Sequence, residues 1–250
     1  MCYFSIVIPC YNRADTVHST IKSVQEQSFS DWECIIIDDG SSDGTKREVE
    51  KIADLDSRVK YFHQENGERS RARNNGFSKS KGKYICFLDS DDFFEKDHLK
   101  IVHGEIAIKN EPVALFFTNS IELHGEKIVE QNFPTYDNTK AKYLLVNSLI
   151  PARVIVHNEI LKTEKFDPDI VIVEDAILWA RISMKFPVFH IESNTVIYAI
   201  HEDNSINGNN YSGRKRLNGL KIFEKRYPQI IKKLPSGFFK DLMSDCYFRI

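Results

Sequence analysis

The first half of the sequence alternates short apolar runs with stretches of helical periodicity, and this alternation narrows the folds open to the chain. Nearly continuous apolar strands separated by helices are typical of a mostly parallel sheet that helices cover on both faces. Because crossovers between parallel strands are right-handed, the carboxyl ends of these strands should lie along one edge. The expected strands are 5–8, 33–37, 59–62, 84–88 and 113–118, and the expected helices are 16–27, 43–53, 70–79 and 97–109.

The second half is less regular and indicates a mixed region followed by helices. No repeat and no Pro/Ser-rich linker separates it from the first half, which favours one compact domain. We expect a hairpin over 121–130 that turns near 124–126, a strand at 152–156, helices at 158–163 and 174–184, paired strands at 188–191 and 195–200, a polar loop at 201–211, and terminal helices at 213–227 and 237–247.

Composition excludes several classes of protein. Of the 250 residues, 42% are hydrophobic, which is enough for a sizeable core. The formal net charge of −2 argues against nucleic acid as the main partner, because proteins that bind nucleic acid usually have a basic excess. No apolar run approaches the ~18 residues of a membrane span, and the first residues lead into a strand without a basic leader, so we expect a cytoplasmic protein. The five cysteines have no metal-ligand spacing and are expected to be free thiols of the core.

The run Asp89-Ser90-Asp91-Asp92 ends the apolar stretch of the fourth expected strand. Carboxylates packed this closely repel one another unless a cation or polar ligand groups offset the repulsion. The run therefore suggests a divalent metal ion or a polar ligand at the carboxyl edge of the sheet. The alternative is an acidic turn with no ligand, because Asp and Ser favour turns and helix starts.

Two further polar clusters follow strands and should reach the same edge. Residues 9–12, Pro-Cys-Tyr-Asn, follow the first strand, and residues 38–43, Asp-Asp-Gly-Ser-Ser-Asp, follow the second. A carboxylate here can accept hydrogen bonds from a pyrimidine N–H or from ribose hydroxyls. The alternative for 38–43 is a capped strand-to-helix turn, in which Ser41 and Asp43 cap the next helix.

Three other elements carry candidate chemistry. The basic segment 70–76 could pair through its arginines with a nucleotide's phosphates or with the acidic clusters themselves, or could be an exposed helix start. Glu174 and Asp175 open the strongest helix of the second half, either as a general base or as acids that complement the helix dipole. His201 could ligate a metal, contact a phosphate, or be solvated.

The order and spacing of these motifs resemble the family 2 glycosyltransferases, inverting enzymes of the GT-A fold. The likeness covers about residues 1–210. It implies a Rossmann-like, mostly parallel sheet flanked by helices, with a small mixed acceptor-side region and C-terminal helices. It also implies a domain over 1–212, divided into a nucleotide-binding half (1–118) and an acceptor-binding half (119–212), and a helical extension over 213–250. The matching motifs are Val7-Ile8-Pro9-x-Tyr11-Asn12, Asp38-Asp39-Gly40-Ser41-x-Asp43, Ala72-Arg73-Asn74-x-Gly76, Phe87-Leu88-Asp89-Ser90-Asp91-Asp92, Glu174-Asp175-x-x-Leu178-Trp179-x-Arg181 and, more loosely, His201-x-x-x-Ser205.

The resemblance also implies roles for individual residues. Asp175 would be the general base, and Glu174 and Trp179 would lie on the acceptor side. Asp91 and His201 would bind Mn²⁺ or Mg²⁺. The donor would be bound by Pro9, Tyr11, Asn12, Asp39, Arg73, Asp89 and Asp91.

The implied function is transfer of a sugar, with inversion, from a nucleotide-sugar donor such as a UDP-sugar to a hydroxyl of a glycan or lipid-linked acceptor, in cell-surface polysaccharide synthesis. Peripheral association with the inner face of the membrane stays open. One alternative is a sugar-phosphate nucleotidyltransferase, although residues 10–13 replace the Gly-rich basic loop that such enzymes carry. The other is a catalytically inactive sugar-nucleotide-binding relative.

Overall fold

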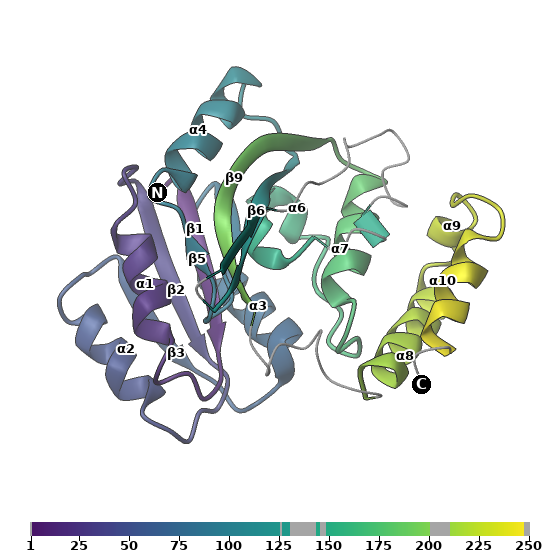
Figure 1. Ribbon diagram of the computed structural model, residues 1–250. Helices are drawn as coiled ribbons and strands as arrows, with labels where there is room; N and C mark the ends of the chain where they lie inside the picture. Colours follow the sequence, from purple (N-terminus) through teal and green to yellow (C-terminus); the bar gives the residue numbers. More distant parts are fainter. Residues whose placement is uncertain (1, 126, 131–143, 146–148, 201–210, 248–250) are drawn as a thin grey trace.

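The computed structural model describes residues 2–125, 127–130, 144–145, 149–200 and 211–247 (Figure 1). A central sheet carries helices on both sides, and the C-terminal helices form a separate group next to α7. The strands are β1 (Phe4–Cys10), β2 (Trp32–Asp38), β3 (Val59–His63), β4 (Tyr84–Phe87), β5 (Phe93–Phe94), β6 (Leu115–His124), β7 (Lys127–Glu130), β8 (Val154–His157) and β9 (Val188–Ile200). The helices are α1 (Val17–Gln25), α2 (Thr45–Ala53), α3 (Glu68–Lys79), α4 (His98–Ile108), α6 (Asn158–Leu161), α7 (Glu174–Ser183), α8 (Tyr211–Arg226), α9 (Pro228–Ile231) and α10 (Phe238–Tyr247), with a 3₁₀ turn at Pro151–Arg153.

The sheet is parallel in its first half and mixed beyond it. The strand order is β3-β2-β1-β4-β8-β6-β9-β5, with β7 paired to β6. β1, β2, β3 and β4 run parallel, whereas β8 is antiparallel to both of its neighbours. The chain leaves β1 toward β2 on one side and reaches β4 on the other. β1 is thus a topological switch point, where open α/β sheets leave a crevice at the strand ends.

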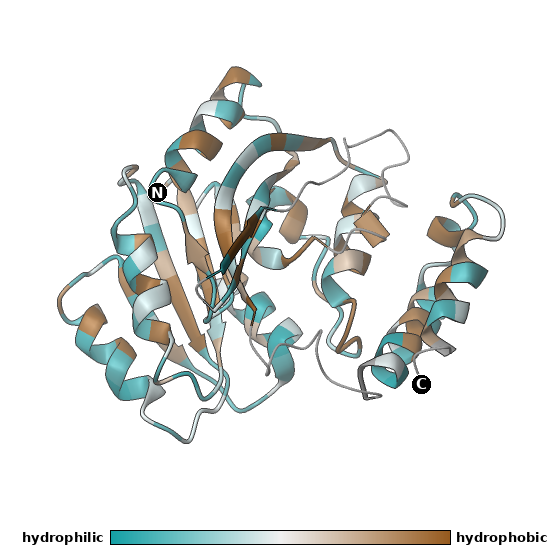
Figure 2. Ribbon diagram, in the orientation of Figure 1, coloured by the Kyte–Doolittle hydropathy of each residue, from teal (hydrophilic) through white to brown (hydrophobic). Residues whose placement is uncertain are grey.

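Two apolar layers cover the parallel strands because their side chains alternate between the faces. Ile6 and Ile8 of β1 pack with α1, α2 and α4, and Val7 packs with α3, α6 and α7. Figure 2 shows the hydrophobic residues gathered in the strands and hydrophilic residues along the outer turns of α2. Burial of both faces explains why the strands read as continuous apolar runs rather than alternating ones.

A close approach of α3 to β1 brings the basic segment of the sequence to the sheet. A Cβ at Gly76 would lie 2.2 Å from Val7 Cγ1, so only glycine permits this packing. Arg73, one turn earlier in α3, is buried as a result. The glycine therefore places a cation beside the strand ends.

The prediction of two paired strands at 188–191 and 195–200 is wrong, because β9 is one strand of 13 residues that runs parallel to β6. The polar residues between the predicted strands form an irregularity in the pairing. Thr118 pairs with Ile191, and the next residue, Asn119, pairs with Asn194. A bulge absorbs extra residues without ending a strand, and this removed the periodic signal. The hairpin over 121–130 is confirmed, with His124 opposite Lys127.

The C-terminal helices pack on α7. Ile177 and Ala180 of α7 share an apolar cluster with Leu220 and Phe223 of α8 and with Leu242 of α10. All five cysteines are free thiols; four are buried as core thiols were expected to be, and Cys2 is half-buried. In the described part of the chain, no helix combines the length and apolar character needed to cross a bilayer. The polar loop predicted at 201–211 falls almost wholly outside the described residues.

Candidate active site

A cavity of about 410 Å³ opens at the carboxyl ends of β1, β2 and β4. Six of the seven predicted donor contacts line it, namely Pro9, Tyr11, Asp39, Arg73, Asp89 and Asp91. The seventh, Asn12, joins two loops instead, because its side-chain oxygen accepts a hydrogen bond from the Ser42 backbone N–H at 2.9 Å. The structure therefore brings together motifs that are far apart in the sequence.

The two carboxylates that follow β2 have different positions. Asp38 is buried and accepts from Tyr61 Oη at 2.7 Å and from the Ser41 N–H at 2.8 Å, so it holds its own loop. Asp39 lines the cavity, and its Oδ1 accepts from Gln64 Nε2 at 2.6 Å and from the Gly67 N–H at 2.9 Å. These bonds fix the direction of the Asp39 carboxylate before a ligand arrives.

The alternative interpretation, a turn in which Ser41 and Asp43 cap the next helix, holds for Asp43 but is wrong for Ser41, whose Oγ accepts from the Asn12 N–H at 2.9 Å instead. Asp43 accepts from the Thr45 N–H at 2.9 Å at the start of α2. Segment 38–43 therefore serves both purposes, with Asp39 directed to the cavity and Asp43 to the helix. The two interpretations were alternatives in the sequence, but they apply to different residues.

A buried ion-pair chain links the two halves of the protein. Arg73 Nη2 donates to Asp89 Oδ1 at 2.7 Å, and Arg73 Nη1 donates to Glu174 Oε1 at 3.0 Å. The Arg73 side chain is 1% exposed, and that of Glu174 is 5% exposed. Arg73 was expected to contact the donor, but its two terminal nitrogens are engaged by these carboxylates. Arg73 thus connects the loop after β4 with the first residue of α7.

Arg73 and the two carboxylates favour one another's charged forms. Burial disfavours the charged form of Arg73, but Asp89 and Glu174 outweigh burial and raise its pKa. Burial likewise acts to raise the pKa of Asp89, but the Arg73 guanidinium more than offsets this and lowers it. Removing one partner from such a pair leaves an uncompensated buried charge.

The three carboxylates of residues 89–92 have different partners, which reduces the repulsion among them. Asp89 pairs with Arg73, and Asp91 lies 3.8 Å from Arg13 Nη2. Asp92 is fully buried, and its Oδ1 accepts from the Ala199 N–H of β9 at 3.2 Å. Burial, together with the charges of Asp89 and Asp91, raises the pKa of Asp92 well above its usual range. Asp92 thus joins the acidic loop to β9 as a group that favours its neutral form.

Glu174 and Asp175 open α7 directly after a left-handed residue. Val173 precedes the helix with φ of 67°, which is unusual for a β-branched side chain. Burial and the neighbouring Glu174 raise the pKa of Asp175 to about 7. Asp175 does not line the cavity itself. It lies next to Glu174, whose partner Arg73 does. A carboxylate with a pKa near neutrality beside a ligand cavity has the properties of a general base.

Two predicted site residues, Trp179 and His201, are not found at the cavity among the described residues. Trp179 was expected on the acceptor side, but it is fully buried, and its indole N–H donates to the Leu149 carbonyl at 3.0 Å. It packs against Phe87 and Phe166 and therefore supports the core behind α7. The expectation came from the family motif, and a motif gives the order of residues but not which side of α7 faces the core. His201 lies outside the described residues.

The cavity also has lining residues that the sequence analysis missed. Arg13 and Arg69 line it, and Arg69 Nε approaches Glu174 Oε1 at 4.0 Å. Their signal was adjacency, since each lies next to a motif that was recognised. Tyr198 of β9 lines the cavity as well, and no local pattern indicated it, because the prediction had divided β9 into two strands.

The residues present can be compared with what a divalent ion needs. Among the described residues, no three His, Cys, Asp or Glu side chains are grouped so as to hold a metal. Mg²⁺ usually takes one or two carboxylates and completes its shell with water and substrate phosphates. Asp91, which lines the cavity, fits this mode of binding as a carboxylate that would share the ion with water and substrate phosphates.

Comparison with solved structures defines the class of fold. Over 99% of this chain and 72% of the other, the protein superimposes on Staphylococcus aureus TarS 1–349 in complex with UDP-GlcNAc, with a TM-score of 0.76 and 18% identity. It also matches the Pyrobaculum calidifontis mannosyltransferase PcManGT in complex with GDP-Man and Mn²⁺, over 98% of this chain and 69% of the other, with a TM-score of 0.67 and 14% identity. The fold is that of the GT-A glycosyltransferases.

The family follows from the sequence comparison. The family model described as glycosyl transferase family 2 matches residues 5–163, more than half of the chain, and the protein belongs to that family.

Curated relatives extend the likeness beyond the family model. An uncharacterized glycosyltransferase of Rickettsia bellii is 31% identical over 83% of this chain and 30% of its own length. The GalNAc(5)-diNAcBac-PP-undecaprenol β-1,3-glucosyltransferase of Campylobacter jejuni is 28% identical over 81% of this chain and 66% of its own length. In several curated relatives the match spans well under half of the relative, for example 16% of a glycosyltransferase of Rickettsia conorii.

Proposed function

We propose that this protein is a metal-assisted, inverting glycosyltransferase that moves a sugar from a UDP-sugar to a hydroxyl of a lipid-linked glycan precursor. The observation that supports the proposal most is the pairing of two features. A cavity lined by Asp39 and Asp91 lies at the strand ends, and a carboxylate with a pKa of about 7, Asp175, is connected to that cavity through Glu174 and Arg73.

The donor end of the cavity suits a nucleotide. Asp39 presents an oriented carboxylate that can accept from a pyrimidine ring N–H or from ribose hydroxyls. Tyr11 is 49% exposed at the mouth, where a base could stack on its ring. The TarS complex contains UDP-GlcNAc, which favours a uridine nucleotide over the guanosine of the PcManGT complex, since TarS has the higher TM-score of the two.

The residues support a single displacement. Asp175 would take the proton from the acceptor hydroxyl as that oxygen attacks the sugar from the face opposite the diphosphate. One base suffices for inversion, so no protein nucleophile is needed. Arg13 and Arg69 lie where cations can stabilise the departing diphosphate. Asp91 would hold Mn²⁺ or Mg²⁺, which supplies further charge neutralisation to the leaving group.

The acceptor is inferred from relatives and from charge. The named activities of the Campylobacter jejuni and Escherichia coli relatives both involve undecaprenol-diphosphate-linked sugars. Residues 211–247 contain nine Lys or Arg but three Asp or Glu, although the whole chain is slightly acidic. A basic segment next to α7 would favour peripheral contact with an anionic membrane that carries such an acceptor, on its inner face.

The test is sugar transfer from a panel of UDP-, GDP- and dTDP-sugars to short undecaprenol-diphosphate-linked saccharides, with Mn²⁺. Asp175→Asn should lower turnover by ~100-fold or more at pH 7, because it removes the base but keeps the shape of the side chain. UDP affinity, measured by titration calorimetry, should stay close to that of the parent. Wild-type transfer by Asp175→Asn would contradict the mechanism.

The same assay separates the two alternatives. Pyrophosphate release from a nucleoside triphosphate and a sugar phosphate would point to a nucleotidyltransferase. Tight UDP binding without turnover of any donor in the panel would point to a non-catalytic binding protein.

A further inference from the structure

The helix α8 lies against the segment that leads into α7. A Cβ at Gly219 of α8 would come within 2.7 Å of the Ile172 carbonyl oxygen and 3.1 Å of Val173 Cγ2. The first distance is shorter than real Cβ contacts, so any larger residue must push the 172–173 backbone away. Glycine therefore lets α8 sit directly on the two residues that precede Glu174.

The segment under α8 is strained. Val173 has φ of 67°, in the left-handed region that is costly for a β-branched residue. No side chain caps the helix at this residue, and the Val173 carbonyl accepts the helical bond from the Ile177 N–H at 3.0 Å. Such a conformation persists only where the surroundings fix it. The Val173 side chain packs on the apolar cluster shared by α7, α8 and α10.

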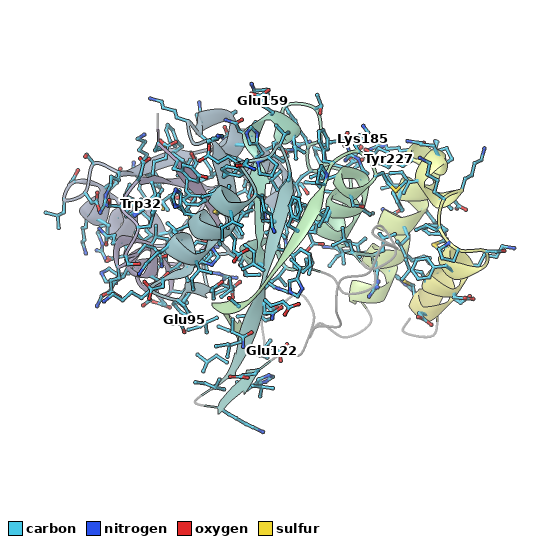
Figure 3. The ribbon with its side chains drawn as sticks, turned by 90° about the horizontal axis from the view of Figure 1, so that it is seen from above. Trp32, Glu95, Glu122, Glu159, Lys185 and Tyr227 are labelled. Carbon is cyan, nitrogen blue, oxygen red and sulfur yellow. The ribbon has the colours of Figure 1, made fainter. Side chains whose placement is uncertain are left out.

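Two constraints therefore meet at the start of α7. Glu174 is held from the cavity side by Arg73, and Val173 is held from the opposite side by α8. Figure 3, viewed from above, shows the C-terminal helices beside α7 and on the side away from the N-terminal half. Lys185 and Tyr227, labelled there, line a second cavity of about 320 Å³ between the end of α7 and the C-terminal helices, so the contact continues along α7.

We propose that Val173 and Gly219 are positioning residues, through which the C-terminal helices hold the left-handed turn that directs Glu174 to Arg73 and Asp175 to the acceptor. The inference rests on the proposed function, because it takes Asp175 as the base. It gives the C-terminal helices a part in turnover although none of their described residues lines the donor cavity.

The first test compares two side chains at Val173. Val173→Ala and Val173→Gly both remove the contacts of the valine with α8, but glycine adopts a left-handed backbone without strain and alanine does not. We expect Val173→Ala to lower kcat by about tenfold, since small displacements of catalytic groups have large effects on turnover. Val173→Gly should keep a kcat at least about threefold higher than Val173→Ala. Donor KM and UDP affinity should stay near the parent values in both.

The second test acts from α8. Gly219→Ala should lower kcat by about tenfold with little change in UDP affinity, because the added methyl displaces the 172–173 backbone. Gly104→Ala is the matched control, since Gly104 lies inside α4 and a Cβ there would meet nothing within 4 Å. The control should keep parental kcat and, through helix propensity, should not lower the melting temperature. If Gly219→Ala does not fold, the Val173 pair decides alone.

The outcomes separate this inference from the proposed function. Equal kcat in Val173→Ala and Val173→Gly, or parental kcat in a folded Gly219→Ala, would overturn the positioning roles. Loss of UDP affinity in step with kcat would also overturn them, because a general structural defect would then explain the result. Parental transfer by Asp175→Asn would instead overturn the proposed function.

Discussion

The donor side and the acceptor side of this protein place their functional carboxylates in different ways. Asp39, directly after β2, is oriented by Gln64 and Gly67 in the loop that follows the neighbouring parallel strand β3. Asp175 depends on distant contacts, with Arg73 on one side of Glu174 and α8 on the other side of Val173. The donor site is thus built locally at the ends of parallel strands, and the base is built by tertiary packing. Substitutions far from the cavity should therefore affect the base more than they affect donor binding.

The strongest challenge to this comparison is Arg73→Met, which cuts the link between the regions. It leaves Asp89 and Glu174 without their partner, and we expect a loss of about 3–5 kcal/mol in the free energy of unfolding, as for a broken buried ion pair. Chemical denaturation measures it. Arg73→Lys, which keeps the charge but not the two-pronged geometry, should lie between Met and the parent. An unchanged midpoint in Arg73→Met would mean that the two regions are not energetically coupled here.

A second prediction tests the donor side alone. Gly76→Ala would place a Cβ 2.2 Å from Val7 Cγ1, and overpacking of this kind costs about 1–3 kcal/mol. UDP affinity should fall as well, because α3 carries Arg73 and Arg69 to the cavity. Thermal unfolding and calorimetry, with Gly104→Ala as the control, would measure both effects. Parental UDP affinity would show that the position of α3 does not set donor binding.

A third prediction concerns β9, the strand shared by the cavity and the bulge. His98 of α4 is fully buried and contacts Thr195 Oγ1 at 2.8 Å through Nδ1, and burial lowers its pKa to about 3. Its folded pKa lies below the unfolded value, so the stability it contributes is present above pH 6.5 and is lost as the pH falls toward 3. Between pH 6.5 and 5 the loss should be about 2 kcal/mol. His98→Phe should flatten this slope, and an equal slope in both proteins would exclude His98 as its source.

The smallest effect should come from Glu174→Gln, which keeps shape and an acceptor oxygen but removes a charge. That charge helps to raise the pKa of Asp175 to about 7, so the variant should have a lower Asp175 pKa. Because the base works in its deprotonated form, the acid limb of the pH profile of kcat should move to lower pH. Asp43→Asn is a control, since Asp43 caps α2 rather than contacting α7. A shift to higher pH in Glu174→Gln would contradict the charge argument.

The parallel half of the fold could be predicted from local pattern. Strands at 5–8, 33–37 and 84–88 are buried on both faces, so their apolar runs carried a strong signal; the structure extends the first two by one or two residues at each end and ends the third at Phe87. The division into domains and extension stays a prediction. β9 could not be predicted, because a bulge opposite Thr118 and Asn119 interrupts its periodicity, and pairing with β6 is a property of the whole sheet.

The sequence by itself determined that the carboxylates that follow β2 and β4 would gather at one edge of the sheet, beside the end of β1, because parallel strands with right-handed crossovers must end together. Only the tertiary structure decided what each one does. The burial of Arg73 between Asp89 and Glu174 and the raised pKa values of Asp92 and Asp175 depend on which charges meet and how much water is excluded. The spacing of residues along the sequence does not show which charges will meet or how much water will be excluded. Contacts between residues as distant as Gly219 and Ile172 fix both, and these form only when the chain has folded.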